Sequence, residues 1–204
     1  MPSPDRSSPR TQAERSAATR NALADATIDL LVEHGWAAVT VVEVCHRAEV
    51  TRGAFHHHYA DLAELVADAL RRLYATYPTT RRPPQATDLA GLIDATWAVV
   101  GQPRFKAVLE AWLAMANDPS LRAEIGPVVV EFAALANPEA GSSTILSDEA
   151  RRGYYLMARE ALLGLALGRA TNGGKALGHE KAVLRALRAG AEALEPGRRP
   201  RQST

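Results

Sequence analysis

The side chains best suited to chemistry lie close together in the segment TVVEVCHRAEVTRGAFHHHY, residues 40–59. Thr40 and Thr51 each stand where a helix would begin, and the hydroxyl, the amide N–H groups and the helix dipole at such a position favour phosphate. Arg52 follows directly, and its guanidinium can donate to both O6 and N7 of guanine. These residue types at this spacing predict contact with the backbone and base edges of DNA.

The same segment offers small and imidazole side chains. Gly53 and Ala54 would let the start of the second helix approach DNA closely, and His56 and His57 on its outer face could reach phosphates or bases. Arginines ahead of the segment would add to the affinity. The predicted DNA-binding residues are Thr40, Thr51, Arg52, Gly53, Ala54, His56, His57 and Arg20.

Other chemistry is less well supported. Consecutive residues point about 100° apart on a helix, so His56, His57 and His58 cannot share one metal ion well, and no cysteine or acid completes a site. Cys45 is either a redox switch or, as is usual for a lone cysteine on an inward face, a packing residue. The sequence has no nucleophile elbow, HExxH motif, P-loop or glycine-rich strand–helix motif. We therefore expect no enzyme, no metal and no cofactor.

Composition alone does not point to nucleic acid. The 204 residues carry a net charge of +1, and residues 1–77 hold eight arginines, no lysine and ten acidic residues, whereas DNA-binding domains are usually basic. The longest apolar runs are far short of the roughly 20 residues that span a bilayer, and the first residues have no hydrophobic stretch for a secretory signal. We therefore expect a soluble cytoplasmic protein without a membrane segment.

Helical periodicity surrounds the motif. Apolar residues repeat at helical spacing from Leu23 to Leu31, and Gly35 suits the end of that helix. Short helices at 41–48 and from Thr51 are separated by only a few residues, as in a helix-turn-helix, whose second helix lies in the major groove. The core that these two short helices share is expected to contain Val44, Ala48, Val50, Phe55 and Tyr59.

The remaining chain is also predicted to be helical. Further helices are expected at 61–77, 87–100, 103–116, 119–136, 147–171 and 179–194. Pro127 should kink or split the helix that contains it. No run alternates with period two over a strand length, so the predicted fold class is all-α. The expected organisation is a disordered N-terminal arm (1–15), a three-helix helix-turn-helix DNA-binding domain (16–77, motif 40–59), a larger C-terminal helical domain for ligand binding and dimerisation (78–194) and a disordered tail (195–204).

Two further sites are predicted in the C-terminal domain. Residues on amphipathic helices could line a pocket for a small-molecule effector, although aromatic residues there are more often core. The candidate pocket residues are Trp97, Phe105, Trp112, Met115, Asn117, Phe132 and Tyr154. The last two helices carry long apolar stripes that either pack within one subunit or form a two-fold interface. The candidate interface residues are Tyr155, Leu162, Leu165, Arg169, Val183, Leu187, Gly190 and Leu194.

Over residues 17–77 the chain resembles the TetR family of bacterial regulators. The matching residues are Leu23, Ala26, Leu30, Leu31 and Gly35 in the first helix, the link Trp36–Val41, Val44, the stretch Ala48–Tyr59 and Leu65. The resemblance implies an Ω-shaped homodimer of two-domain subunits with about nine helices each, the last two forming a four-helix interface. It further implies a repressor that a small molecule releases.

Three residues depart from the family pattern. Glu49 stands where glycine is usual in the turn, at a cost of about 1 kcal/mol if the left-handed conformation is kept. Leu62 replaces a lysine that commonly contacts phosphate, and His56 replaces a common tyrosine. The expected function is a ligand-released repressor that binds a palindromic operator as a homodimer. An activator of the same family, a helical protein-interaction module and a helical enzyme remain alternatives.

Overall fold

The computed structural model of the protein describes residues 11–77, 86–136, 144–146 and 148–195. These residues form nine α-helices and two short 3-10 helices and contain no β-strand, which confirms the all-α prediction. No helix in the described ranges is long and apolar enough to cross a membrane. In chain order the helices are α1 (Gln12–His34), η1 (Trp36–Ala38), α2 (Val41–Arg47), α3 (Arg52–His58), α4 (Leu62–Thr76), α6 (Leu89–Val100), α7 (Phe105–Asn117), α8 (Pro119–Ala136), η3 (Thr144–Leu146), α9 (Glu149–Thr171) and α10 (Glu180–Ala193).

Side-chain caps set where α2, α3 and α4 begin. Thr40, Thr51 and Asp61 each accept a hydrogen bond from the backbone amide three residues further on, which satisfies a donor that the helix itself leaves unpaired. Thr40 and Thr51 are the caps that the sequence predicts, and α2 and α3 begin at the predicted residues.

The first helix begins earlier than predicted. Thr11 accepts a hydrogen bond from the Glu14 amide (3.2 Å), and the Glu14 carboxylate accepts one from the Thr11 amide (2.7 Å). This reciprocal capping box starts α1 at Gln12, so the expectation of disorder at 12–15 is wrong. The rest of the predicted arm, 1–10, lies outside the described residues.

The C-terminal helices also hold more of the chain than predicted. Glu195, which the sequence places in the disordered tail, accepts a hydrogen bond from the Leu89 amide at 2.9 Å and pairs with Arg151 at 2.7 Å. It therefore ties the end of the chain to α6 and α9, while the remainder of the predicted tail, 196–204, lies outside the described residues. Pro127 stands within α8 without splitting it.

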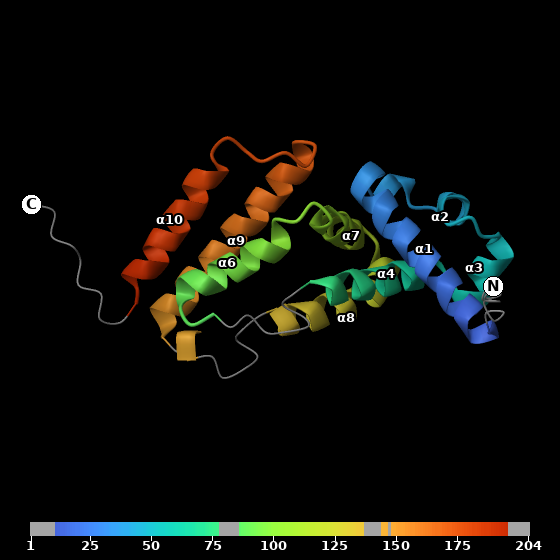
Figure 1. The fold of residues 1–204 in the computed structure, drawn as a ribbon, viewed down its shortest axis with the longest axis horizontal. Helices are drawn as coiled ribbons and strands as arrows, with labels where there is room; N and C mark the ends of the chain where they lie inside the picture. Colours follow the sequence, from blue (N-terminus) through green and yellow to red (C-terminus); the bar gives the residue numbers. More distant parts are fainter. Residues whose placement is uncertain (1–10, 78–85, 137–143, 147, 196–204) are drawn as a thin grey trace, which may run out of the picture.

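The helices are arranged along one long axis (Figure 1). The helices α2 and α3 lie at one end and α10 at the other. Between them, α4 packs against both α1 and α8, and α1 also packs against α7. The helices α6, α9 and α10 pack on one another at the far end. The predicted domain boundary after Tyr77 falls at 78–85, outside the described residues, and α4 contacts helices on both sides of it.

Candidate nucleic-acid interface

A small buried core fixes the short helix α3 against α2. Val44 of α2 and Phe55 of α3 are fully buried, and Tyr59, which ends α3, is 2% exposed. Ala48 and Val50 pack against this core from the turn. Because the inward residues of α3 are held in this way, its outward residues have fixed positions.

The turn between α2 and α3 is closed by backbone hydrogen bonds. The amide of Val50 donates to the carbonyl of Cys45 at 3.0 Å, and the amide of Glu49 donates to that of His46 at 3.2 Å, the paired bonds of a Schellman motif. This motif requires a left-handed residue, and Glu49 supplies it with φ = 55°. Among the described residues it is the only non-glycine residue with positive φ, so the expected cost of the departure from glycine is retained.

The outward face of α3 carries the residues predicted to bind DNA. Arg52, Gly53, His56 and His57 are exposed and Ala54 is half-buried. The N-caps Thr40 and Thr51 are exposed as well. The structure therefore brings seven of the eight predicted residues to the surface of one helix-turn-helix.

Gly53 has no structural requirement for glycine within the chain. Its φ is not positive, and a Cβ built on it would meet only Thr51 Oγ1 among the described atoms, at 3.7 Å, an ordinary contact. The fold would therefore accept a larger residue at this exposed position. A closely approaching partner would give glycine a use at this position.

The eighth predicted residue, Arg20, is engaged within the chain. Its guanidinium pairs with Asp68 at 3.2 Å and lies over the ring of Tyr59, 5.2 Å from the centroid. Tyr59 also donates a 2.5 Å hydrogen bond to Asp68. Burial is the main cause, and the hydrogen bond to Asp68 the second, that raises the pKa of Tyr59 to about 12. Arg20 thus joins α1 to α3 and α4, and its side chain is still about half exposed.

Burial shifts the pKa values of Cys45 and His58. Burial raises the pKa of the Cys45 thiol, which disfavours the reactive thiolate, so packing is the better interpretation. Burial and the neighbouring His57 lower the pKa of His58. No group of three His, Cys, Asp or Glu side chains in the described part of the chain is arranged to hold a metal.

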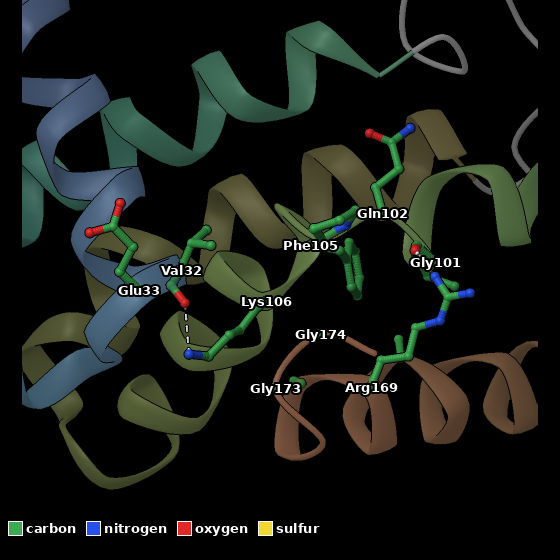
Figure 2. Close-up of a pocket in the computed structure, with 13 residues that line it drawn as sticks. Val32, Glu33, Gly101, Gln102, Phe105, Lys106, Arg169, Gly173 and Gly174 are labelled. Atoms are coloured by element: carbon green, nitrogen blue, oxygen red, sulfur yellow. Dashed lines mark hydrogen bonds between the residues drawn. The ribbon is translucent and has the colours of Figure 1, made fainter. Parts of the chain in front are cut away.

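The predicted effector residues do not gather around one cavity. A cavity of about 310 Å³ lies between the end of α1, the α6–α7 turn and the end of α9 (Figure 2), and of the predicted set only Phe105 lines it. Phe132 instead stacks on Tyr74 at 3.8 Å, and Tyr154 donates to the Leu187 carbonyl of α10 at 2.9 Å. Asn117 is exposed, Trp97 lies beneath Arg169, and Trp112 packs edge-on to Phe105. Met115 packs against the core and does not line the cavity.

Sequence reasoning missed two residues of α7 that hold the end of α1. Lys106 donates to the Val32 carbonyl at 2.7 Å, and Glu110 accepts from the Trp36 amide at 3.0 Å. Gly35 lies between these two points with φ = 78°, and a Cβ there would come within 3.0 Å of Glu110. The only sequence signal was a Lys–Glu pair at i, i+4, which would ordinarily be interpreted as a pair on a helix surface.

Several of the predicted interface residues pack within the single chain. Tyr155, Leu162, Leu165 and Leu187 are at most 7% exposed within the single chain, where α6 packs on both α9 and α10. Gly190 is covered by Tyr154, and Val183 and Leu194 pack against the core. Arg169 pairs with the buried Glu180 at 2.6 Å and donates to the Gly101 carbonyl. The structure supports packing within one subunit for Tyr155, Leu162, Leu165 and Leu187. For Arg169, Val183, Gly190 and Leu194, which are half-buried, the interface stays a prediction.

A different face of the same helix pair is exposed. On α9, Met157 is 54% and Leu167 is 45% exposed, and Gly164 between them has no described atom within 4 Å of a built Cβ. On α10, alanines at i, i+4, i+7 and i+11 are exposed; these are Ala182, Ala186, Ala189 and Ala193. Because α6 covers the other side of both helices, the exposed residues form one surface, here called the outer face of α9 and α10.

Comparison with known proteins places these features in a family. Residues 23–69 match the family model of the bacterial regulatory proteins of the tetR family. The chain is 30% identical over 119 residues to the HTH-type transcriptional regulator CymR of Pseudomonas putida, an alignment that covers 55% of this chain. The alignment spans only 59% of the length of that relative.

Solved structures share the fold over most of the chain. A transcriptional regulator from Rhodococcus sp. Rha1 superposes with a TM-score of 0.65 at 22% identity, covering 85% of this chain and 94% of its own. The regulator FadR of Bacillus subtilis, solved in complex with stearoyl-CoA, superposes with a TM-score of 0.61 at 15% identity, covering 83% and 98%. At these identities the likeness concerns the fold.

Proposed function

The chain belongs, we propose, among the repressors of the TetR family of bacterial regulatory proteins. It binds a palindromic operator as a homodimer and leaves it when a small molecule binds. Similarity to this family supports the coarser part of the proposal, a DNA-binding transcriptional regulator. The sign of regulation, the operator symmetry, the dimer and the effector are our proposal.

The observation that carries the proposal is the outward face of α3. It presents a guanidinium, two imidazoles and a bare glycine backbone on a helix whose inward residues are buried. Arg52 would donate to guanine in the major groove, while the exposed caps Thr40 and Thr51 would contact phosphates beside it. The close approach of DNA would explain why Gly53 carries no side chain.

The dimer in this proposal uses the outer face of α9 and α10. An exposed apolar stripe on one helix beside an alanine stripe on the next favours close helix packing by a second copy. Two subunits would present their α3 helices about 34–36 Å apart, in successive major grooves. A pseudo-palindromic operator follows from this symmetry.

The place of action and the effector complete the proposal. A regulator of bacterial genes acts where the chromosome lies, so we place it in the cytoplasm. FadR of Bacillus subtilis was solved with stearoyl-CoA bound, and this chain is likewise proposed to respond to a small molecule, through differential affinity for its DNA-bound and free states.

Selection of genomic fragments on the purified full-length chain, followed by footprinting, tests the proposal. The expected result is one or a few fragments that contain an inverted repeat whose half-sites lie one helical turn apart. Bound fragments without a common sequence, or protection of a single half-site, would contradict the operator and the dimer together.

A further inference from the structure

The cavity between α1, α7 and α9 has apolar walls and one distinctive charge (Figure 2). Its apolar lining comes from Val100, Phe105, Ala166 and Ala170. Gly173 and Gly174 border it without side chains, and both have positive φ and open space at a built Cβ. The cavity therefore stays open next to the α9–α10 turn.

Three charged side chains line the cavity, and two of them are paired elsewhere. Glu33 forms a 2.6 Å ion pair with Arg47 of α2, and Arg169 is held by Glu180 through two 2.6 Å hydrogen bonds. The half-buried Lys106 is within ion-pair distance of no carboxylate in the described part of the chain, and the one hydrogen bond of its ammonium there is to the Val32 carbonyl. An ammonium has three N–H donors, so Lys106 can bind an anion in the cavity.

We infer that this cavity binds a small organic acid, whose carboxylate accepts a hydrogen bond from Lys106 Nζ and whose apolar part lies against Phe105 and Val100. A volume of about 310 Å³ is at the lower end of the range of ligand pockets, roughly 300–1,000 Å³. A short-chain carboxylate fits this volume. A whole acyl-CoA thioester, with its nucleotide and long chain, does not.

The same lysine connects the cavity to the DNA-binding helices. Lys106 and Glu110 hold the chain on either side of Gly35, through the Val32 carbonyl and the Trp36 amide. A carboxylate in the cavity would draw the Lys106 ammonium toward it and away from the Val32 carbonyl. Loss of this contact frees the end of α1 from α7, and α1 leads through η1 into α2 and α3. The anion would therefore shift the position of the helix-turn-helix.

Isothermal titration of the full-length chain without DNA tests the binding step. The probes are hexanoate and its neutral counterpart hexanamide. We expect the wild type to bind hexanoate at least about tenfold more tightly than hexanamide, because only hexanoate offers Lys106 a charged hydrogen-bond acceptor. Lys106→Met should lose at least about tenfold in hexanoate affinity by the same reasoning, and Lys106→Arg should retain binding.

Lys181→Met is the matched control, because Lys181 is exposed on α10 and does not line the cavity. It should bind hexanoate as the wild type does. Equal affinity for hexanoate and hexanamide, no heat with millimolar hexanoate, or unchanged binding in Lys106→Met would each overturn the site. If Lys106→Met fails to fold, by circular dichroism, the comparison of the two probes on wild type still decides.

The coupling step rests on the proposed function and has its own readout. Fluorescence anisotropy on the selected operator should show weaker DNA binding of the wild type with saturating hexanoate, and no change for Lys106→Met. DNA affinity unaltered by bound hexanoate would overturn the coupling. A chain that binds no DNA would refute the proposed function and leave the titration to decide the anion site.

Discussion

Glu49 holds the left-handed position of the turn between α2 and α3, where its φ is 55°. A side chain in that conformation costs roughly 1–2 kcal/mol, whereas the greater freedom of glycine in the unfolded chain costs about 0.4–1 kcal/mol. Glu49→Gly should therefore raise the free energy of unfolding by up to about 1 kcal/mol, measured by urea denaturation at fixed protein concentration. Glu49→Ala, which keeps the Cβ, is the control. A Glu49→Gly variant less stable than Glu49→Ala would contradict the assignment of strain.

Gly53 lets the stability of the fold and the binding of DNA be measured separately. A methyl group at this site meets only Thr51 Oγ1 at 3.7 Å among described atoms, and alanine favours helix over glycine by about 0.5–1 kcal/mol. Gly53→Ala should leave the chain at least as stable as wild type, yet weaken operator binding in fluorescence anisotropy. Unchanged operator affinity would mean that DNA does not approach this backbone.

At the residue scale, the sequence predicts the exposed residues of α3 but not the cavity. Threonine caps and an arginine on the outward side of a short helix are local features, so Thr51 and Arg52 can be identified from spacing alone. The contact between Lys106 and the Val32 carbonyl joins positions 74 residues apart. Nothing in the local pattern of either segment indicates such a pair.

At the element scale, Arg20, Tyr59 and Asp68 join α1, α3 and α4. Because the pKa of Tyr59 is raised from its ordinary 10.0 to about 12, folded Tyr59 keeps its proton in a range where an unfolded tyrosine loses it. The contribution of this protonation to the free energy of unfolding is fully present below pH 10 and is lost as the pH rises toward 12.

Tyr59→Phe removes that titration together with a hydrogen bond to a carboxylate. At pH 7 the variant should be less stable by about 1–3 kcal/mol, and its stability should fall less steeply than that of wild type between pH 10 and 12. Urea denaturation at pH 7, 10 and 11.5 measures both effects. Identical alkaline slopes for the two proteins would show that Tyr59 does not titrate as described.

Helix positions follow from sequence more reliably than helix faces. The caps at Thr40, Thr51 and Asp61 and the apolar periodicity locate α2, α3 and α4 to within a residue or two. On α9, by contrast, leucines occur on several sides, so periodicity cannot decide which side α6 covers. Leu162 is buried under α6 while Leu167 is exposed. This ambiguity is the reason that the predicted interface set includes residues buried within the single chain.

At the scale of the whole molecule, the exposed outer face of α9 and α10 predicts the state of assembly. Leu167→Glu would place a charge in a two-fold interface, where it faces its own copy. Sedimentation equilibrium should give twice the 21.9 kDa chain mass for wild type and a shift toward the single-chain mass for the variant. Leu113→Glu, at a leucine of α7 that is 59% exposed, should remain a dimer. A monomeric wild type, or a Leu167→Glu dimer as stable as wild type, would exclude this face.

The account depends most directly on the claim that α3 is presented to a DNA duplex, and one titration tests it. Operator binding is measured by fluorescence anisotropy for wild type, Arg52→Ala and Arg188→Ala, the last a control at an exposed arginine of α10, at the opposite end of the molecule (Figure 1). Arg52→Ala should lose about 1–3 kcal/mol of specific binding, roughly five- to 150-fold in affinity, and Arg188→Ala should match wild type. An Arg52→Ala variant that binds the operator as tightly as wild type would contradict the account.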